Sequence, residues 1–220
     1  EQARKLGIRI ETGKGISTVK GSKKVEGVTI CSQAGGGEAL EEISCDCVAM
    51  SGGWSPVVHL WSHCGGKLNW DDLNCMFKPD DANPPIGANG EQFVTVAGTA
   101  NGYLLIDEVL MNAHDAAIRI VKKITGRSPT IKCPKSISIK ENQLVPVWFM
   151  PHGASQKLKM KTFLDFQNDV KVTDVELSAQ EGFESVEHTK RYTTLGMATD
   201  QGKLSNINGL AVLSNSLNLP

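Results

Sequence analysis

The sequence has no apolar run long enough to span a lipid bilayer, and it does not open with the charged and then apolar pattern of a secretory signal peptide. It also lacks net charge of either sign, formally −1 at pH 7, so no global field attracts nucleic acid or a membrane surface. Internal repeats and low-complexity tracts are missing too. We therefore expect neither nucleic acid nor a membrane among the partners of this protein.

The composition that remains is that of an ordinary globular protein. Its 220 residues are 40% hydrophobic and 21% charged, enough for one large or two small domains. Six cysteines without a secretory signal indicate reduced thiols in the cytoplasm. Cys31 and Cys133 fall in mostly apolar strands, where we expect them to be small core residues.

Short β-rich runs separated by Gly- and Lys-rich turns occupy residues 8–50. The last of them, "CDCVAMSGG", predicts a buried parallel strand that ends at a glycine pair. A short helix with Ser55 as N-cap and Pro56 in its first turn is expected next. In "EQFVTVAGTANG" an apolar strand leads into an elbow of small residues, and a helix with one apolar stripe follows over residues 103–124. Because the chain opens on what reads as the last turn of a helix, we expect a portion of a longer protein.

The second half of the chain changes character. Residues 125–161 are rich in Pro, Ser and Lys and predict a connecting segment. "TFLDFQNDV" predicts a short strand, and two helices joined at Gly182 follow it, with Thr173 and Ser185 as N-caps. The second domain is therefore expected to be small and mainly helical, and the closing "NGLAVLSNSLNLP" is a further helix-like run.

These stretches resemble a known family. "CDCVAMSGGWSPVVHLWSHCGGKLNWDD" and "VTVAGTANG" are similar to the closing part of the two-dinucleotide-domain flavoprotein fold. "FLDFQNDVKVTDVELSAQEGFESVEHTKRYTTLGMATDQGKLSNINGLA" closely resembles a stretch of the alpha subunit of heterotetrameric sarcosine oxidase. The resemblance implies an α/β fold, with residues 1–127 as the C-terminal part of an FAD- or NAD-type dinucleotide-binding region and 128–160 as a connecting segment. Residues 161–210 would be a small helical, ferredoxin-like domain, and 211–220 the start of a linker to a downstream region.

The resemblance also implies an activity and its cofactors. The parent enzyme would be an oxidoreductase acting on CH–NH donors, converting sarcosine with oxygen into glycine, peroxide and a methylene group for tetrahydrofolate. Its partners would be the beta, gamma and delta subunits. Its cofactors would be NAD, FMN shared with another subunit, and FAD held elsewhere, so this portion alone is expected to be inactive. An alternative is a non-catalytic scaffold on which other subunits dock.

The elbow is where the resemblance implies NAD. In the flavoprotein fold, backbone N–H groups there meet the cofactor, beside an acidic residue that binds sugar hydroxyls. The acidic position holds Thr99, whose hydroxyl bonds more weakly than a carboxylate, and this departure fits NAD. The expected contacts are the glycine-pair edge and the elbow itself: Ser51, Gly52, Gly53, Gly98, Thr99, Ala100, Asn101 and Gly102. Alternatively, the elbow glycines only allow a helix to pack closely on a strand.

The small domain also resembles one that binds a two-iron, two-sulfur cluster in related amine dehydrogenases, through a Cys-x-Cys pair and a "GMGxCQGxxC" loop. The four ligand positions hold Asp165, Gln167, Asp200 and Ser205 here. Because such clusters need thiolates or, rarely, histidine, we expect no iron–sulfur cluster.

The run "KRYTTLGMATDQGK" gathers cationic and hydroxyl side chains at the end of the second helix. Such groups can converge on a phosphate, and the resemblance places FMN at a subunit junction near this segment. The expected FMN-binding residues are Lys190, Arg191, Thr193, Thr194, Gln201 and Lys203. The competing interpretation is a solvated helix end whose cations favour the helix dipole.

A zinc or redox-thiol module is a further alternative. Cys45 and Cys47 would share one face of a strand, and His59 and His63 are four apart on an expected helix. The Cys-x-Cys spacing lacks the two-residue gap common in zinc knuckles, and buried cysteines explain the same pattern. We therefore expect no metal ligands.

Overall fold

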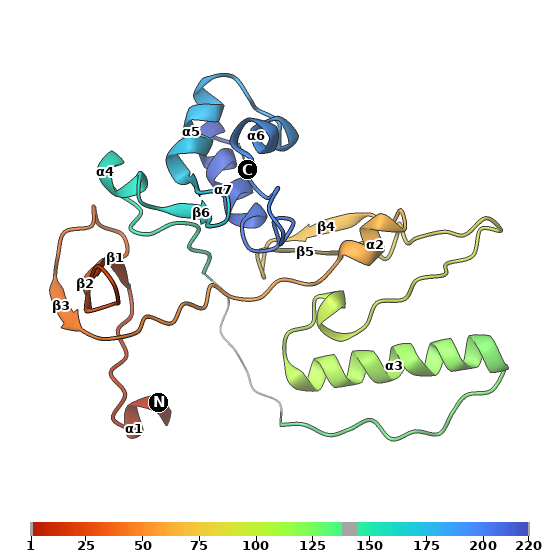
Figure 1. The fold of residues 1–220 in the computed structure, drawn as a ribbon. Coiled ribbons are helices and arrows are strands. Elements are labelled where there is room, and N and C mark those ends of the chain that lie inside the picture. Colours follow the sequence, from red (N-terminus) through yellow and green to blue (C-terminus); the bar gives the residue numbers. More distant parts are fainter. Residues whose placement is uncertain (1, 138–144, 220) are drawn as a thin grey trace. The chain divides into compact units, whose positions relative to one another are not determined.

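The structure is a computed structural model that describes residues 2–137 and 145–219. It forms two compact units, one made of Glu1–Met50 with Val147–Pro220 and the other of Ser51–Pro146 (Figure 1). The connecting segment expected at residues 128–160 falls partly on 138–144, which lie outside the described residues. No helix among the described residues is long and apolar enough to cross a membrane.

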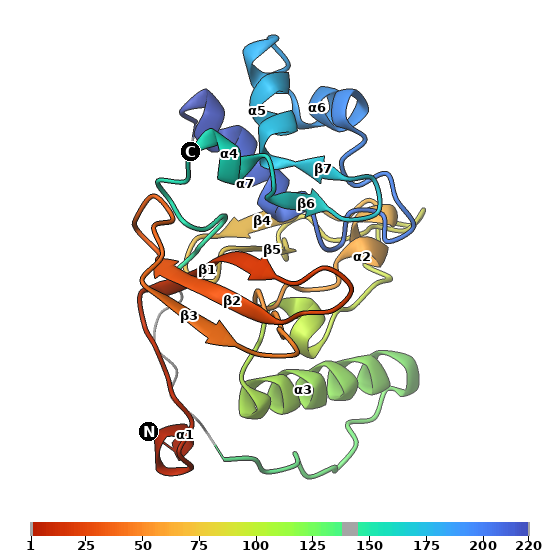
Figure 2. The ribbon, with the colours of Figure 1, turned by 60° about the vertical axis from the view of Figure 1, so that its left-hand side comes forward.

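The first unit begins with a three-stranded antiparallel sheet in the order β1-β2-β3 (Figure 2). Its register pairs Val28 with Val19 on one side and with Ile43 on the other, so the middle strand carries the buried side chains. Cys31 is fully buried there, as expected. The elements are α1 (Gln2–Lys5), β1 (Lys14–Lys20), β2 (Gly27–Ser32) and β3 (Glu41–Ser44).

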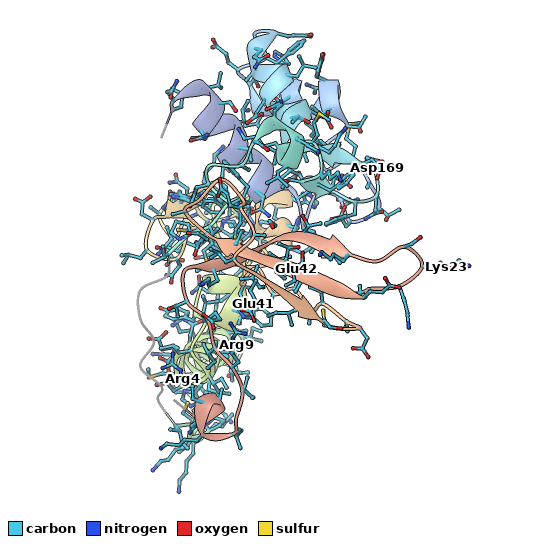
Figure 3. The ribbon with its side chains drawn as sticks, turned by 90° about the vertical axis from the view of Figure 1, so that its left-hand side faces the viewer. Arg4, Arg9, Lys23, Glu41, Glu42 and Asp169 are labelled. Carbon is cyan, nitrogen blue, oxygen red and sulfur yellow. The ribbon has the colours of Figure 1, made fainter. Side chains whose placement is uncertain are left out.

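Arg9 ties the segment before this sheet to β3. Its guanidinium donates to both carboxylate oxygens of Glu41, at 2.7 and 2.6 Å, and to Glu11 at 2.7 Å (Figure 3). The hydrogen bond from Arg9 holds the pKa of the Glu41 carboxyl below its ordinary value. This exposed fork fixes the strand edge through paired charge-assisted hydrogen bonds.

The helical part of the same unit has its own hydrophobic core. A β6–β7 hairpin and helices α5 and α7 enclose it, and the side chains of Val172, Val175 and Val212 are almost completely buried. The Asp174 side chain accepts the N–H of Lys171 at 2.8 Å, so the N-cap is Lys171 rather than the expected Thr173, and the helix begins at Val172. The elements are α4 (Gln156–Lys159), β6 (Phe163–Asp165), β7 (Val170–Lys171), α5 (Val172–Gln180), α6 (Val186–Thr193) and α7 (Asn206–Leu217).

The second unit has buried hydrophobic side chains of its own, among them Trp61, Met76 and Ala116. The Trp61 indole N–H donates to the Lys67 carbonyl at 2.7 Å, which satisfies its polar edge inside this core. The helix expected over residues 103–124 forms over Ile106–Thr125, with Asp107 and Glu108 in its first turn and Gly126 as its C-cap. The elements are α2 (His59–His63), β4 (Leu68–Asp71), β5 (Met76–Pro79), the 3₁₀ helix η1 (Gly98–Asn101) and α3 (Ile106–Thr125).

The expected mixture of helices and strands is confirmed, but the prediction of a buried parallel strand is wrong. Every paired strand in the described ranges is antiparallel. Residues 45–50 follow β3 without regular structure and are half-buried or exposed, and residues 93–97 before the elbow form no strand either. An apolar run becomes a buried strand only when partner strands lie on its edges, and the described residues supply none at either place.

Two boundaries also differ from those expected. The short helix α2 begins after Val58 rather than at Ser55. Helix α7 crosses the boundary expected at residue 210. Val212 and Leu213 are core residues of the helical part of the first unit (residues 156–217, here called the small unit) rather than the start of a linker. Ser185 does begin α6, as predicted. The apolar side chains of α7 need a buried surface, and α5 provides it.

The core of the small unit can be tested by shortening one side chain. Val175→Ala removes two methyl groups from a fully buried site and should lower the free energy of unfolding by roughly 1.5 to 3 kcal/mol. Val186→Ala is the matched control, because that valine is 45% exposed at the start of α6. Denaturant melts of the two variants measure the difference. If both variants lost equally little free energy of unfolding, Val175 would not belong to the core.

Candidate functional site

The elbow is held between the start of α3 and the hairpin strand β5. Gly98 is buried, and its N–H donates to the Asn112 side-chain oxygen at 2.8 Å. Gly98 adopts φ +61°, and a Cβ added to it would lie 3.1 Å from the Val109 side chain. A side chain is therefore disfavoured here both by backbone conformation and by close packing.

The rest of the elbow combines a tight turn with an open surface. The N–H groups of Gly102 and Tyr103 donate back to the carbonyls of Thr99 and Gly98, at 3.1 and 3.4 Å. Thr99 is exposed, while Ala100 and Asn101 are half-buried. Packing thus explains the glycines, and the Thr99 hydroxyl remains accessible to a ligand.

The glycine-pair edge, residues 51–53, makes no hydrogen bond to the elbow among the described residues. Ser51, Gly52 and Gly53 are exposed and lie in neither helix nor strand. The parallel strand that would have carried them to the elbow is not formed.

The basic run after α6 is partly explained by the helix end itself. The Thr193 hydroxyl donates to the Thr189 carbonyl at 2.7 Å and accepts the Leu195 N–H at 3.2 Å. Thr194 and Gln201 have positive φ and form turns. The exposed Arg191 guanidinium donates from Nη1 to the Glu187 carbonyl at 3.3 Å, and its Nη2 lies 3.6 Å from the Glu187 carboxylate. Lys190 is half-buried and Lys203 is exposed. Among the described residues, the side chains of these two lysines take no part in the hydrogen bonds of the helix end, whereas that of Arg191 does.

Asp165 is the residue whose role the sequence did not reveal. Its side chain is 4% exposed, and its first carboxylate oxygen accepts the N–H groups of Gln167 and Asn168, at 2.9 and 3.1 Å. The second oxygen accepts the N–H of Gly196 at 3.2 Å, across 31 residues of sequence. One carboxylate therefore ties the β6–β7 turn to the loop that follows α6.

Two of the other three cluster-type positions make bonds of the same kind. The side-chain oxygen of Gln167 accepts the Thr199 N–H at 3.2 Å and also the Thr199 hydroxyl. Asp200 accepts the N–H groups of Gly202 and Leu204, each at 3.2 Å. The side chains of Asp165, Gln167 and Asp200 thus all accept backbone N–H groups of the loop between α6 and α7. The fourth, Ser205, is 1% exposed, and its hydroxyl has no partner among the described residues.

The zinc or thiol alternative gains no support from the structure. Cys45 and Cys47 follow β3 instead of sharing one face of a strand, and they belong to the first unit. His59 and His63 lie on α2 in the other unit. Among the described residues, no group of three His, Cys, Asp or Glu side chains comes together to hold a metal ion.

Comparison with known proteins identifies first the fold and then the family. The chain shares the fold of the L-proline dehydrogenase from P. horikoshii, with a TM-score of 0.66 and 18% identity, covering 94% of this chain and 40% of that one. Residues 159–219 match the family model of the sarcosine oxidase A3 domain.

Two relatives extend this match to most of the chain. Sarcosine oxidase subunit alpha of Rhizobium meliloti (strain 1021) is 33% identical over 200 residues, 90% of this chain and 18% of that subunit. The subunit alpha of Corynebacterium sp. (strain U-96) is 34% identical over 188 residues, 84% of this chain and 18% of that subunit. The chain is thus a relative of the sarcosine oxidase alpha subunits, as the resemblance predicted, and it spans about a fifth of their length.

The Asp165 carboxylate can be tested by a single-atom change. Asp165→Asn places an amide nitrogen against one of the buried N–H donors and removes the charge, so it should lower the free energy of unfolding by roughly 1.5 to 3 kcal/mol. Asp169→Asn is the control, because Asp169 lies in the same turn, is exposed and has φ +55° (Figure 3). Thermal melts compare the two. Similar melting temperatures for both variants would contradict a structural role for the carboxylate.

Proposed function

We propose that this chain is a cofactor-binding and subunit-contacting portion of a sarcosine oxidase alpha subunit. The enzyme converts sarcosine, oxygen and tetrahydrofolate into glycine, peroxide and methylenetetrahydrofolate. The identity of about a third with two alpha subunits, over 84% or more of this chain, is the observation that carries the proposal. The chain spans about a fifth of these relatives, so turnover belongs to an assembly with beta, gamma and delta subunits.

Within that assembly the elbow contributes to an NAD site. Its support is the close packing around Gly98, which keeps the backbone free of a side chain, together with the exposed hydroxyl of Thr99. A hydroxyl can bind the sugar of a dinucleotide without adding the negative charge of a carboxylate. The α3 helix, anchored through Asn112, fixes the elbow in this conformation.

Two substitutions test the elbow. Thr99→Val removes the hydroxyl at an exposed site and should weaken NAD binding by about five- to tenfold, the loss of one ordinary hydrogen bond. Gly98→Val should abolish binding, because a branched side chain would meet Val109 and displace the turn. NAD content and affinity of the assembled enzyme are the measurements.

Gly126→Val is the control for backbone strain. Gly126 has φ +70° at the end of α3, and a Cβ there meets nothing within 4 Å. We expect this variant to keep NAD at the wild-type stoichiometry. Unchanged NAD affinity in both elbow variants would instead show that the elbow only packs a helix, which is the scaffold alternative.

The cations in the last turn of α6 and in the loop after it contribute to the phosphate site of FMN at a subunit junction. Their support is the exposure of Arg191 and Lys203, and the weak pairing of Arg191 with Glu187. A guanidinium grips phosphate oxygens with two parallel N–H bonds, whereas an ammonium supplies a point charge. Arg191 should therefore matter more than its lysine neighbours.

Arg191→Met tests this site while keeping most of the side-chain stem. Loss of one charge-assisted contact should reduce FMN retention about ten- to a hundredfold, or roughly 1.5 to 3 kcal/mol. Lys157→Met, which changes another exposed cation on α4, is the control and should retain FMN fully. The measurement is FMN per FAD in the reassembled enzyme after dialysis. Equal retention in both variants would mean that Arg191 only decorates a helix end.

A further inference from the structure

His114, in the middle of α3, holds the chain segment that leaves this helix. The segment of residues 127–137, here called the connector, turns back after α3 and runs beside it in the opposite direction (Figures 1 and 2). The Nε2 atom of His114 lies 2.8 Å from the carbonyl oxygen of Ile131 in the connector. Among the described residues, this is the hydrogen bond that joins α3 to residues 128–137.

The two partners of the imidazole require both of its nitrogens to donate. The Nδ1 atom lies 3.1 Å from a carboxylate oxygen of Asp115, and a backbone carbonyl or an ionised carboxylate can only accept. A neutral ring carries one N–H and must leave one of these acceptors without a donor. The protonated ring alone satisfies both.

Asp115 is the charged residue that makes a hydrogen bond with His114 among the described residues. The residues one turn away along α3 are apolar: Leu110, Met111, Ala117 and Ile118. Two turns away on the same side lies Asp107, which has one buried carboxylate oxygen without a hydrogen-bond partner among the described residues. The connector adds the carbonyl of Ile131 and three exposed basic side chains: Arg127, Lys132 and Lys135.

We propose that protonation of His114 fastens the connector to α3 and that deprotonation releases it. The connector follows directly on the C-terminal end of α3, and Ile131 lies within it. The protonation state of His114 therefore sets whether the described residues of the connector stay ordered against α3, independently of any cofactor.

The pKa of His114 supports the direction of the effect. The hydrogen bond to Ile131 and then the one to Asp115 raise that pKa above its ordinary value of 6.5. A raised folded-state pKa means that the contact contributes fully below the ordinary value and is lost as the pH rises through the raised one. The switch therefore operates above pH 6.5.

The test is NMR on the full chain. We expect a titration of the His114 ring with a pKa above 6.5, which Asp115→Asn lowers. The backbone of residues 128–134 should be ordered at about pH 5.5 and lose order at about pH 8.5, as heteronuclear relaxation reports. His114→Gln should abolish this pH dependence and leave the connector disordered at both values.

His63→Gln is the matched control, since His63 is an exposed histidine of the same unit. It should leave the pH dependence of the connector unchanged. A His114 pKa at or below 6.5, or a connector whose order is the same at both pH values, would overturn the proposal. The titration of the wild-type protein decides the matter even if a variant misfolds.

Discussion

The buried carboxylate of Asp165 is the interaction on which the small unit depends. Its two oxygens accept three backbone N–H groups, two from the β6–β7 turn and one from the loop after α6. A buried carboxylate is costly unless such donors surround it, so the turn and the loop must keep their positions together. Gln167 and Asp200 extend the arrangement to the rest of the loop, and Leu195, next to Gly196, is thereby held in the hydrophobic core.

The second unit, residues 51–146, depends on an analogous constraint at the elbow. There the side chain of Asn112 holds the buried N–H of Gly98, and Val109 fills the space that a side chain would need. In both units a polar side chain on a regular element fixes an irregular loop, and the loop, together with the end of α6 in the first unit, carries the residues proposed to meet cofactors. The proposed ligand contacts would then lie on surfaces whose backbone is already satisfied internally.

Much of this arrangement follows from the sequence, and the failures have physical reasons. The helices α3, α5, α6 and α7 could be predicted because apolar positions at helical spacing and glycine stops are local signals. The strand expected at residues 45–50 failed because the sequence cannot show whether partner strands flank an apolar run. Asp165 carried a weak local signal, an Asx turn to Gln167, but its bond to Gly196 spans 31 residues and follows only from the fold. His114 was missed for the same reason, because Ile131 reaches it only after the chain reverses. The contacts of Ser51, Gly52 and Gly53 with a cofactor remain predictions.

The central claim is that hydrogen bonds to side-chain oxygens, and not a metal cluster, hold the loop of the small unit. The most direct measurement is iron and acid-labile sulfide in protein purified anaerobically, together with its thermal melt before and after treatment with a strong chelator. The account predicts neither iron nor sulfide, because Asp165, Gln167, Asp200 and Ser205 offer no thiolate, and an unchanged melting temperature after chelation. Stoichiometric iron and sulfide with the visible absorption of a cluster, lost together with stability on chelation, would contradict it.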